Sequence, residues 1–235
     1  TAADCAFFLT AENGLPVQDE KGSFVLDEEA VTAYVQSLAE EYYGYGRTRQ
    51  FHSTRGDVIT IDGGTYGSKM DRKKETAYLL EHLLDPGVHT GTPQSHIPSY
   101  EREAFCYGKN DIGDTYIEVD MTEQKMYYYE KGVLKLETEI VTGNMRRRMG
   151  TPEGVNFVYN KQKNRVLRGP GYASPVKFWM PVKGGIGIHD AGWRKEFGGD
   201  IYQTAGSHGC INTPKDKMEE LFDCVQIGTP VVMFY

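Results

Sequence analysis

The first half of the chain mixes the apolar periods of helices and strands. In residues 26–46, apolar side chains recur three or four positions apart, which predicts an amphipathic helix with Asp27 as its N-cap. A second helix is predicted from Asp71, its N-cap, to Pro86-Gly87. Between the two helices, residues 57–67 alternate like a strand and end in a glycine turn.

The second half has a different pattern of short β-rich runs separated by turn residues. These runs are residues 115–121, 125–132, 133–143, 154–160, 176–182 and 229–235. One helix is predicted, with Thr213 as N-cap and Pro214 at its first position, and with an apolar face of Met218, Leu221, Phe222 and Val225. The pattern predicts a mainly β unit, a sandwich or distorted barrel, with one flanking helix.

Residues 85–113 are rich in Pro, Gly, Ser and His and show no apolar period, so we interpret them as an ordered connector. We therefore expect an α+β domain over residues 1–113 and a mainly β domain over residues 114–235. Charge supports this division. Residues 1–113 hold 10 Lys and Arg against 18 Asp and Glu, whereas residues 114–235 hold 16 against 15.

Composition narrows the function classes. The chain has 235 residues, of which 39% are hydrophobic and 25% charged, as in soluble globular proteins. The net charge of −7 argues against a nucleic-acid partner. No apolar run approaches the roughly 20 residues of a membrane helix. Because the chain begins at Thr1, we expect that an anchor or signal segment is missing from it.

A cysteine follows a histidine closely in GSHGCINTP, residues 206–214. A cysteine attacks as its thiolate, and a pKa of about 8.5 keeps most thiols protonated unless a base or a positive field assists. His208 is close in sequence, but the turn leaves little room for an aligned contact. His189 ends the predicted strand GGIGIHD and is the better base, because a strand end can face a returning loop rigidly. Cys210 is therefore the candidate nucleophile.

The residues around Cys210 fit this interpretation. Gly209 permits backbone angles that let successive N–H groups converge on an oxyanion. Ser207 and Asn212 can hold the loop through side-chain hydrogen bonds. A buried, unreactive Cys210 remains an alternative. So does a zinc site, but the chain lacks Cys-x-x-Cys and His-Glu-x-x-His, and we expect neither metal nor cofactor.

The segments GIGIHDAGW and TAGSHGCINTP together resemble the catalytic signature of the L,D-transpeptidases, the YkuD-type enzymes of peptidoglycan. The resemblance extends upstream to YIEVDMTEQKMYYYEKGVLKLETEIVTGN and GTPEGVNFV, so that it covers about residues 114–235. It implies a YkuD-like catalytic fold. Residues 1–113, chiefly RQFHSTRGDVITIDGGTYGSKMD, resemble the peptidoglycan-binding-type domain that precedes this unit in some Gram-positive members.

The resemblance also implies residue roles. The family's nucleophile falls on Cys210 and its general acid/base on His189, while the motif's second histidine and hydroxyl fall on His208 and Ser207. Many members have glycine where this chain has Asp190, so the group that orients His189 stays open: a backbone carbonyl, Ser207 or Asp190 itself.

Two further side chains allow two interpretations each. Asp190 belongs to the substrate or oxyanion region, or is simply a surface carboxylate. Trp179, in the strand before the histidine strand, lines the cleft or belongs to the core.

The activity implied by the resemblance is the formation of 3→3 cross-links through a Cys210 thioester, with release of the terminal D-alanine from a stem tetrapeptide. The implied partners are a donor tetrapeptide, an acceptor stem and carbapenem inhibitors, and the implied location is the cell wall. Two alternatives stay open. One is an L,D-carboxypeptidase or thiol peptidase that uses water, and the other is a non-catalytic wall-binding module.

Overall fold

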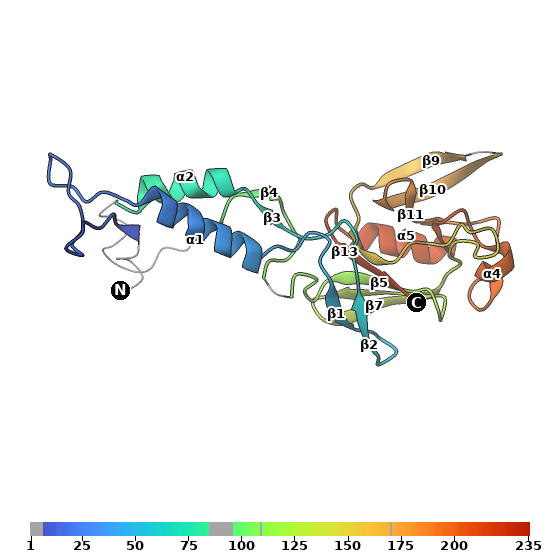
Figure 1. Ribbon diagram of the computed structural model, residues 1–235. Helices are drawn as coiled ribbons and strands as arrows, with labels where there is room; N and C mark the ends of the chain where they lie inside the picture. Colours follow the sequence, from blue (N-terminus) through green and yellow to red (C-terminus); the bar gives the residue numbers. More distant parts are fainter. Residues whose placement is uncertain (1–6, 85–95, 109, 170) are drawn as a thin grey trace. The chain divides into compact units, whose positions relative to one another are not determined.

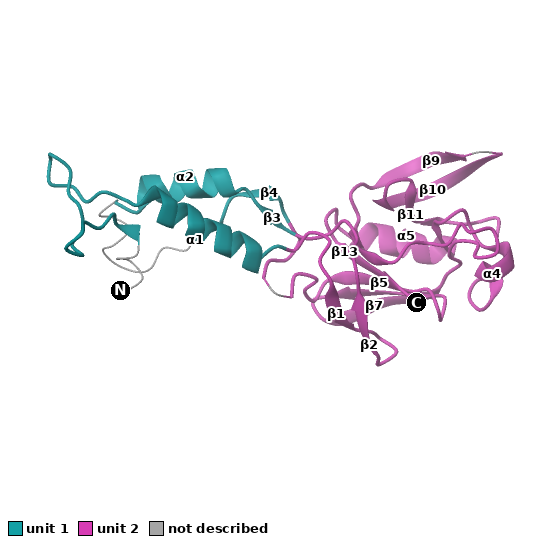
Figure 2. Ribbon diagram, in the orientation of Figure 1, with its two compact units in different colours: residues 1–43, 68–103 teal, residues 44–67, 104–235 magenta. Residues whose placement is uncertain are grey.

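The computed structural model describes residues 7–84, 96–108, 110–169 and 171–235. The chain forms two compact units, coloured separately in Figure 2. Unit 1 comprises Thr1–Tyr43 and Ser68–Glu103, and unit 2 comprises Gly44–Gly67 and Ala104–Tyr235. Part of the first half of the sequence therefore folds with the second half. A domain boundary near Gly113 stays a prediction.

Unit 1 contains the two predicted helices (Figure 1). Its elements are α1 (Glu28–Glu41), α2 (Arg72–His82) and the two-stranded sheet of β3 (Lys69–Met70) and β4 (Tyr100–Arg102). Asp27 accepts a hydrogen bond from the Ala30 amide at 3.0 Å, and Asp71 accepts one from the Lys74 amide at 3.1 Å. Both predicted N-caps are confirmed, since each carboxylate satisfies a first-turn N–H. The predicted stop at Pro86-Gly87 lies outside the described residues.

A pair of antiparallel strands from the first half of the chain belongs to unit 2. These strands are β1 (Arg49–His52), which the sequence did not indicate, and β2 (Val58–Ile61), which it did. They contribute to a small apolar cluster that includes Phe51, Ile61, Tyr66, Val155, Val232 and Phe234. The buried Arg49 also pairs with the buried Asp111 at 2.6 Å, so this segment is held by charge as well as by packing.

Two larger sheets form the rest of unit 2. The five-stranded sheet has the order β7-β6-β5-β13-β8, with β5 (Tyr116–Asp120), β6 (Lys125–Glu130), β7 (Val133–Glu139), β8 (Gly154–Phe157) and β13 (Pro230–Phe234). The four-stranded sheet has the order β12-β11-β10-β9, with β9 (Gln162–Gly169), β10 (Tyr172–Lys183), β11 (Ile186–Asp190) and β12 (Ile211–Thr213). The prediction of a mainly β fold for this part of the chain is confirmed.

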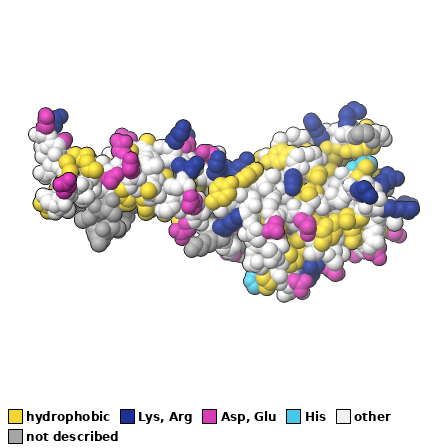
Figure 3. Space-filling model, in the orientation of Figure 1, with side chains coloured by type: hydrophobic (Ala, Val, Ile, Leu, Met, Phe, Trp, Pro, Cys, Tyr) yellow, Lys and Arg dark blue, Asp and Glu magenta, His cyan; other side chains and the backbone are white. Residues whose placement is uncertain are grey.

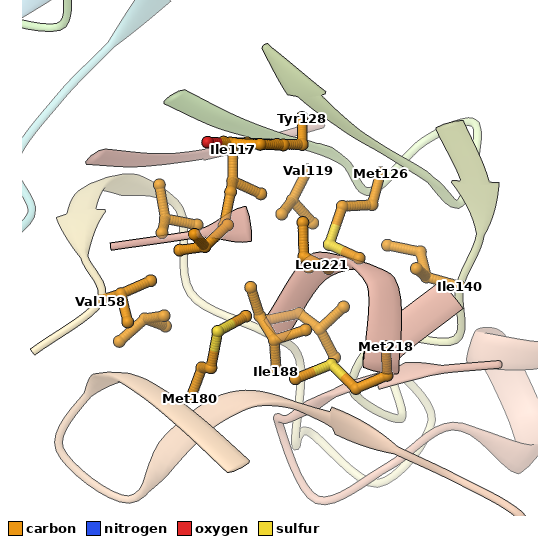
Figure 4. Packing of buried hydrophobic residues seen from close by; sticks show 14 of the residues in the cluster. Ile117, Val119, Met126, Tyr128, Ile140, Val158, Met180, Ile188, Met218 and Leu221 are labelled. Carbon is orange, nitrogen blue, oxygen red and sulfur yellow. The ribbon is translucent and has the colours of Figure 1, made fainter. Parts of the chain in front are cut away.

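Both sheets and helix α5 (Lys215–Cys224) share one apolar core. Figure 4 shows labelled side chains of this core, of which Met218 and Leu221 are contributed by α5. From the four-stranded sheet the core receives Phe178, Met180, Val182, Ile188 and Ile211. Burial of this apolar surface is the main force that fixes β10, β11 and β12, the strands around which the site is built.

Helix α5 begins one residue later than predicted. Thr213 is the last residue of β12, where it pairs with Asp190 of β11, so it cannot cap the helix. Pro214 is the N-cap, with φ −52° and ψ 140°, and Lys215 opens the helix. The predicted start was wrong because strand pairing holds Thr213. The apolar face is buried as expected.

Two elements near the site gave little signal in the sequence. Strand β9 is mostly exposed and polar, and α4 (Ile201–Ala205) is a short helix within the excursion between His189 and Cys210. On the face seen in Figure 3, Lys and Arg side chains lie over the part of unit 2 that carries β9 and α4. Among the described residues, no helix has the length and apolar content needed to cross a membrane.

Candidate active site

The site forms where β11 and β12 run parallel to each other. Their register pairs Ile188 with Ile211 and His189 with Asn212. Successive side chains of a strand point to opposite faces of the sheet, and both isoleucines point into the core. His189 and Asn212 therefore lie on the opposite face. Cys210, two residues before Asn212, lies on that face as well.

Strand β10 adds Trp179 to the same face, because Trp179 pairs with His189 and its neighbours Phe178 and Met180 point into the core. The Trp179 ring lies 5.9 Å from the His189 ring and is only 7% exposed. A Cβ atom on Gly187 would come within 2.7 Å of this indole. The absence of a side chain at Gly187 thus allows β10 to pack closely against the histidine strand.

Cys210 is half-buried and carries a free thiol. Its Sγ atom lies 3.8 Å from the carbonyl oxygen of Gly185. Burial raises the pKa of the Cys210 thiol, and a hydrogen bond from the Gly187 amide opposes that effect. The neutral thiol is therefore favoured at rest, so a base has to remove its proton before or during attack.

His189 is 4% exposed, and its Nδ1 lies 2.9 Å from the carbonyl oxygen of Asp190. Because a carbonyl only accepts, Nδ1 carries the proton in the neutral ring and Nε2 keeps its lone pair. Burial lowers the pKa of His189, and the charge of Arg194 lowers it further, while the Asp190 carbonyl and carboxylate raise it. His189 is thus a neutral imidazole at neutral pH, as a general base requires.

The backbone carbonyl of Asp190, rather than its carboxylate, contacts His189. The Asp190 side chain is buried, and its Oδ1 accepts a hydrogen bond from the Phe178 amide at 2.7 Å. The interpretation of Asp190 as a surface carboxylate was wrong. The side chain continues the β10–β11 ladder beyond the last backbone pair, which fixes the end of the strand that presents His189.

The turn before Cys210 is closed by Ser207. The Ser207 hydroxyl donates to the Cys210 carbonyl at 2.6 Å and accepts from the Gly209 amide at 3.0 Å. Gly209 has φ +114°, a conformation that favours glycine, and its carbonyl accepts from the Thr151 hydroxyl at 2.7 Å. The Gly209 amide is engaged by Ser207, which leaves the His208 and Cys210 amides as the candidate donors to an oxyanion.

The side chains of Asn212 and His208 do not close the turn as that of Ser207 does. Asn212 is 2% exposed and its Oδ1 has no hydrogen-bond partner within the part of the chain that is described, so its side-chain oxygen does not hold the loop. The exposed His208 ring stacks on Tyr172 of β10, with the ring centres 4.6 Å apart. Both residues line the same pocket as Cys210.

Two pockets meet at Cys210. The histidine pocket, of about 190 Å³, is lined by His189, Trp193, Arg194, Ser207, His208 and Asn212. The hairpin pocket, of about 680 Å³, lies along β9 and β10 and is lined by residues that include Gln162, Arg165, Arg168, Trp179 and Gly185. Cys210 and Tyr172 line both pockets. Cys210 can therefore be approached from both pockets.

Arg194 is a site residue that the sequence analysis missed. Its Nη2 donates to the Ala205 carbonyl at 2.7 Å, and its Nε is buried without a partner among the described residues. Only its place in the excursion between His189 and Cys210 pointed to it, and position in a long loop does not say which side chains turn back toward the site. No group of three or more His, Cys, Asp and Glu residues in the described ranges is placed to hold a metal ion.

Cys5 lies outside the described residues. Cys106 has a free thiol.

Comparison with known proteins gives a family for this arrangement. The YkuD model, described as the L,D-transpeptidase catalytic domain, matches residues 114–233. A second model, described as "Putative peptidoglycan binding domain", matches residues 11–87. No curated protein matched the chain.

Two solved structures match over the whole chain. An L,D-transpeptidase of Enterococcus faecium, crystallised as a Cys-to-Ser mutant, is 36% identical, with a TM-score of 0.81 over 100% of this chain and 90% of that one. The avibactam carbamoyl enzyme of Ldtfm is 37% identical, with a TM-score of 0.82 over 100% of this chain and 88% of that one. The chain therefore belongs to the YkuD family of cysteine-dependent L,D-transpeptidases.

Proposed function

We propose that this protein forms 3→3 cross-links between peptidoglycan stem peptides through a thioester on Cys210. One observation carries the proposal. Cys210 lies at the junction of two pockets, on the same sheet face as the buried His189. A transfer between two peptides needs a nucleophile that a donor and an acceptor can both reach, and this arrangement supplies one.

The first step forms the acyl-enzyme. His189 Nε2 takes the proton of the Cys210 thiol, and Sγ attacks the carbonyl carbon of the third residue of a donor tetrapeptide. The bond from that carbon to the nitrogen of the terminal D-alanine then breaks. His189 gives its proton to the departing amine, so free D-alanine leaves and a thioester remains.

The second step reverses the direction of proton transfer. A side-chain amine on the third residue of an acceptor stem attacks the thioester carbonyl, and the carbon–sulfur bond breaks. His189 takes the amine proton and returns it to Sγ. One peptide bond is exchanged for another, so the reaction needs no cofactor and no ATP.

The turn that carries Cys210 stabilises the tetrahedral intermediates in this proposal. The amides of His208 and Cys210 are the donors to the oxyanion, because Ser207 already engages the Gly209 amide. Ser207 stabilises the turn through its hydrogen bond to the Cys210 carbonyl. The Asp190 carbonyl accepts from Nδ1 of His189 and so fixes the tautomer of that ring. Trp179 and Asn212 line the space around the reacting groups.

The remaining expectations follow from the family and from the relatives. The match of residues 11–87 to a peptidoglycan-binding domain supports association with the cell wall. Attachment through a membrane anchor outside this chain stays a prediction. The avibactam carbamoyl enzyme supports covalent inhibition of this protein at Cys210, and we expect carbapenems to acylate the same sulfur.

The test is a Cys210→Ala variant incubated with a disaccharide-tetrapeptide, with products measured by mass spectrometry. We expect the wild-type protein to give dimers and D-alanine, and the variant to give neither. Meropenem should add to the wild-type protein and not to the variant. Cys224→Ala is the matched control, because it removes an exposed thiol outside both pockets and should keep both reactions.

The products also separate the alternatives. Tripeptide without dimer would identify an L,D-carboxypeptidase, in which water replaces the acceptor amine. Absence of any product or adduct from the wild-type protein would favour a wall-binding module. Dimer formation by the Cys210→Ala variant would overturn the proposal.

A further inference from the structure

The histidine pocket contains a cation that the transfer chemistry does not use. Arg194 lines this pocket together with His189 and Cys210. Its backbone amide donates to the Ala191 carbonyl at 2.9 Å, and its Nη2 donates to the Ala205 carbonyl at 2.7 Å. Arg194 is thus fixed at the pocket wall by its backbone, at the start of the loop after β11, and by its guanidinium, at the last residue of α4.

Arg194 has hydrogen-bonding capacity left over. A guanidinium has five N–H donors, and the described residues give its side chain one hydrogen bond, to Ala205, and no carboxylate partner within ion-pair distance. Its Nε is buried and has no partner in the part of the chain that the structure describes. Burial also lowers the pKa of Arg194, which reflects partial loss of water around the charge. An unpaired buried donor is costly, and binding of an anion would relieve that cost.

The proposed reaction places such an anion in this pocket. His189 has to protonate the amine of the departing D-alanine, so this amine must lie on the histidine side of Cys210. The D-alanine carboxylate is joined to that amine through a single Cα atom. The leaving residue therefore brings a carboxylate into the pocket that Arg194 lines, while the acyl part of the donor extends toward the hairpin pocket.

We propose that Arg194 is a specificity-determining residue that binds the carboxylate of the terminal D-alanine. This inference rests on the proposed function. A planar guanidinium suits a carboxylate because it offers parallel N–H donors. The contact selects donors with a free C-terminus one residue beyond the attacked carbonyl. A donor extended by one residue carries its carboxylate about 3.5 Å further away and loses the contact.

The test compares two donors that differ only at the C-terminus. Rates of thioester formation or leaving-group release are measured for a tetrapeptide with a free carboxylate and for the same tetrapeptide as its C-terminal amide. Since charge-assisted hydrogen bonds are strong, we expect the wild-type protein to favour the carboxylate about 10- to 100-fold in kcat/KM. Arg194→Gln should remove most of this preference, mainly through KM, and should treat the amide donor as the wild-type protein does.

The matched control is Lys195→Gln, which removes a neighbouring exposed cation that lines neither pocket. It should keep the full preference. Meropenem labelling of Cys210 in Arg194→Gln checks that the nucleophile is intact. Arg194→Lys, which keeps the charge without the planar donors, should keep part of the preference.

Three results would overturn the inference. One is a wild-type protein that uses both donors equally, which requires no variant and so holds even if Arg194→Gln fails to fold. The second is an unchanged preference in Arg194→Gln. The third is an equal loss of rate with both donors, which would make Arg194 a structural support of the loop. A wild-type protein that acylates Cys210 with neither donor would instead contradict the proposed function.

Discussion

The two faces of β10, β11 and β12 carry opposite kinds of side chain. The core face presents fully buried apolar residues, namely Phe178, Met180, Ile188 and Ile211. The other face presents Trp179, His189 and Asn212, with Cys210 on the turn that leads into β12. Both sets come from the same strands in alternating positions. The packing of one face therefore determines where the reactive groups of the other face lie.

The two faces also differ in the polar groups that they bury. The four core residues named above have apolar side chains with no polar atom to satisfy, whereas the other face holds a buried imidazole and an Asn212 oxygen that has no hydrogen-bond partner among the described residues. Burial lowers the pKa of His189 and raises the pKa of Cys210, so that both groups favour their neutral forms. Such perturbed groups are typical of functional sites, where chemistry takes precedence over full satisfaction of polar atoms.

The largest effect on the reactive face should come from His189→Gln. Loss of the general base should slow D-alanine release by about 10²- to 10⁴-fold. The wild-type rate should rise with pH as His189 loses its proton, with a midpoint below the usual imidazole pKa of about 6.5, because burial lowers the pKa of His189. The variant should lack this acidic limb. A pH–rate profile of D-alanine release measures both effects.

His52→Gln is the matched control, since His52 is an exposed histidine on β1 of the same unit. It should leave the profile unchanged. A His189→Gln rate within a few-fold of wild type would contradict the assignment of His189 as base, and a wild-type midpoint above 6.5 would contradict the lowered pKa of His189.

The sequence predicted the reactive face better than its surroundings. His189 and Cys210 stand in short motifs at the ends of regular strands, so local pattern was enough to select them. Arg194 lies in a loop whose return toward the pocket depends on long-range contacts such as the bond to Ala205. The spacing of apolar and polar residues along the chain does not indicate such a long-range contact.

Tertiary pairing also explains the errors at element ends. Threonine is a residue type favoured at N-caps, but Thr213 pairs with Asp190 and is therefore the last residue of β12. The polar strand β9 lacks alternation because most of its side chains are exposed, and it is defined by pairing with β10. Such pairings override local preference, and an unaligned sequence does not contain them.

A smaller and different effect is expected on the core face. Ile211→Ala should lower the free energy of unfolding by about 2–5 kcal/mol, because it removes buried methyl groups and leaves a cavity. Urea denaturation measures the change. Ile227→Ala is the control, since Ile227 is 58% exposed and its truncation should cost little.

The Ile211→Ala variant should still react with meropenem at Cys210 under conditions in which it is folded. Loss of adduct in the folded variant would show that the two faces are more tightly coupled than the alternating arrangement implies. A stability change as small as that of Ile227→Ala would show that this core position relaxes around the deletion.

The smallest effect should come from Asp190, which links the two faces. Asp190→Ala should cost about 1–3 kcal/mol of unfolding free energy, because the Phe178 amide loses its buried acceptor. Asp190→Asn keeps an oxygen acceptor and should cost less. Both variants keep the backbone carbonyl that accepts from His189 Nδ1, so both should retain D-alanine release near the wild-type rate at pH 8.

The pH–rate profile of Asp190→Asn separates the carbonyl from the carboxylate. The Asp190 charge raises the pKa of His189, so its removal should move the acidic limb to lower pH without lowering the plateau. A plateau as low as that of His189→Gln would mean that the carboxylate itself takes part in the chemistry. The alternating faces would then share a catalytic group at the end of β11, and the separation between support and reactivity would no longer hold there.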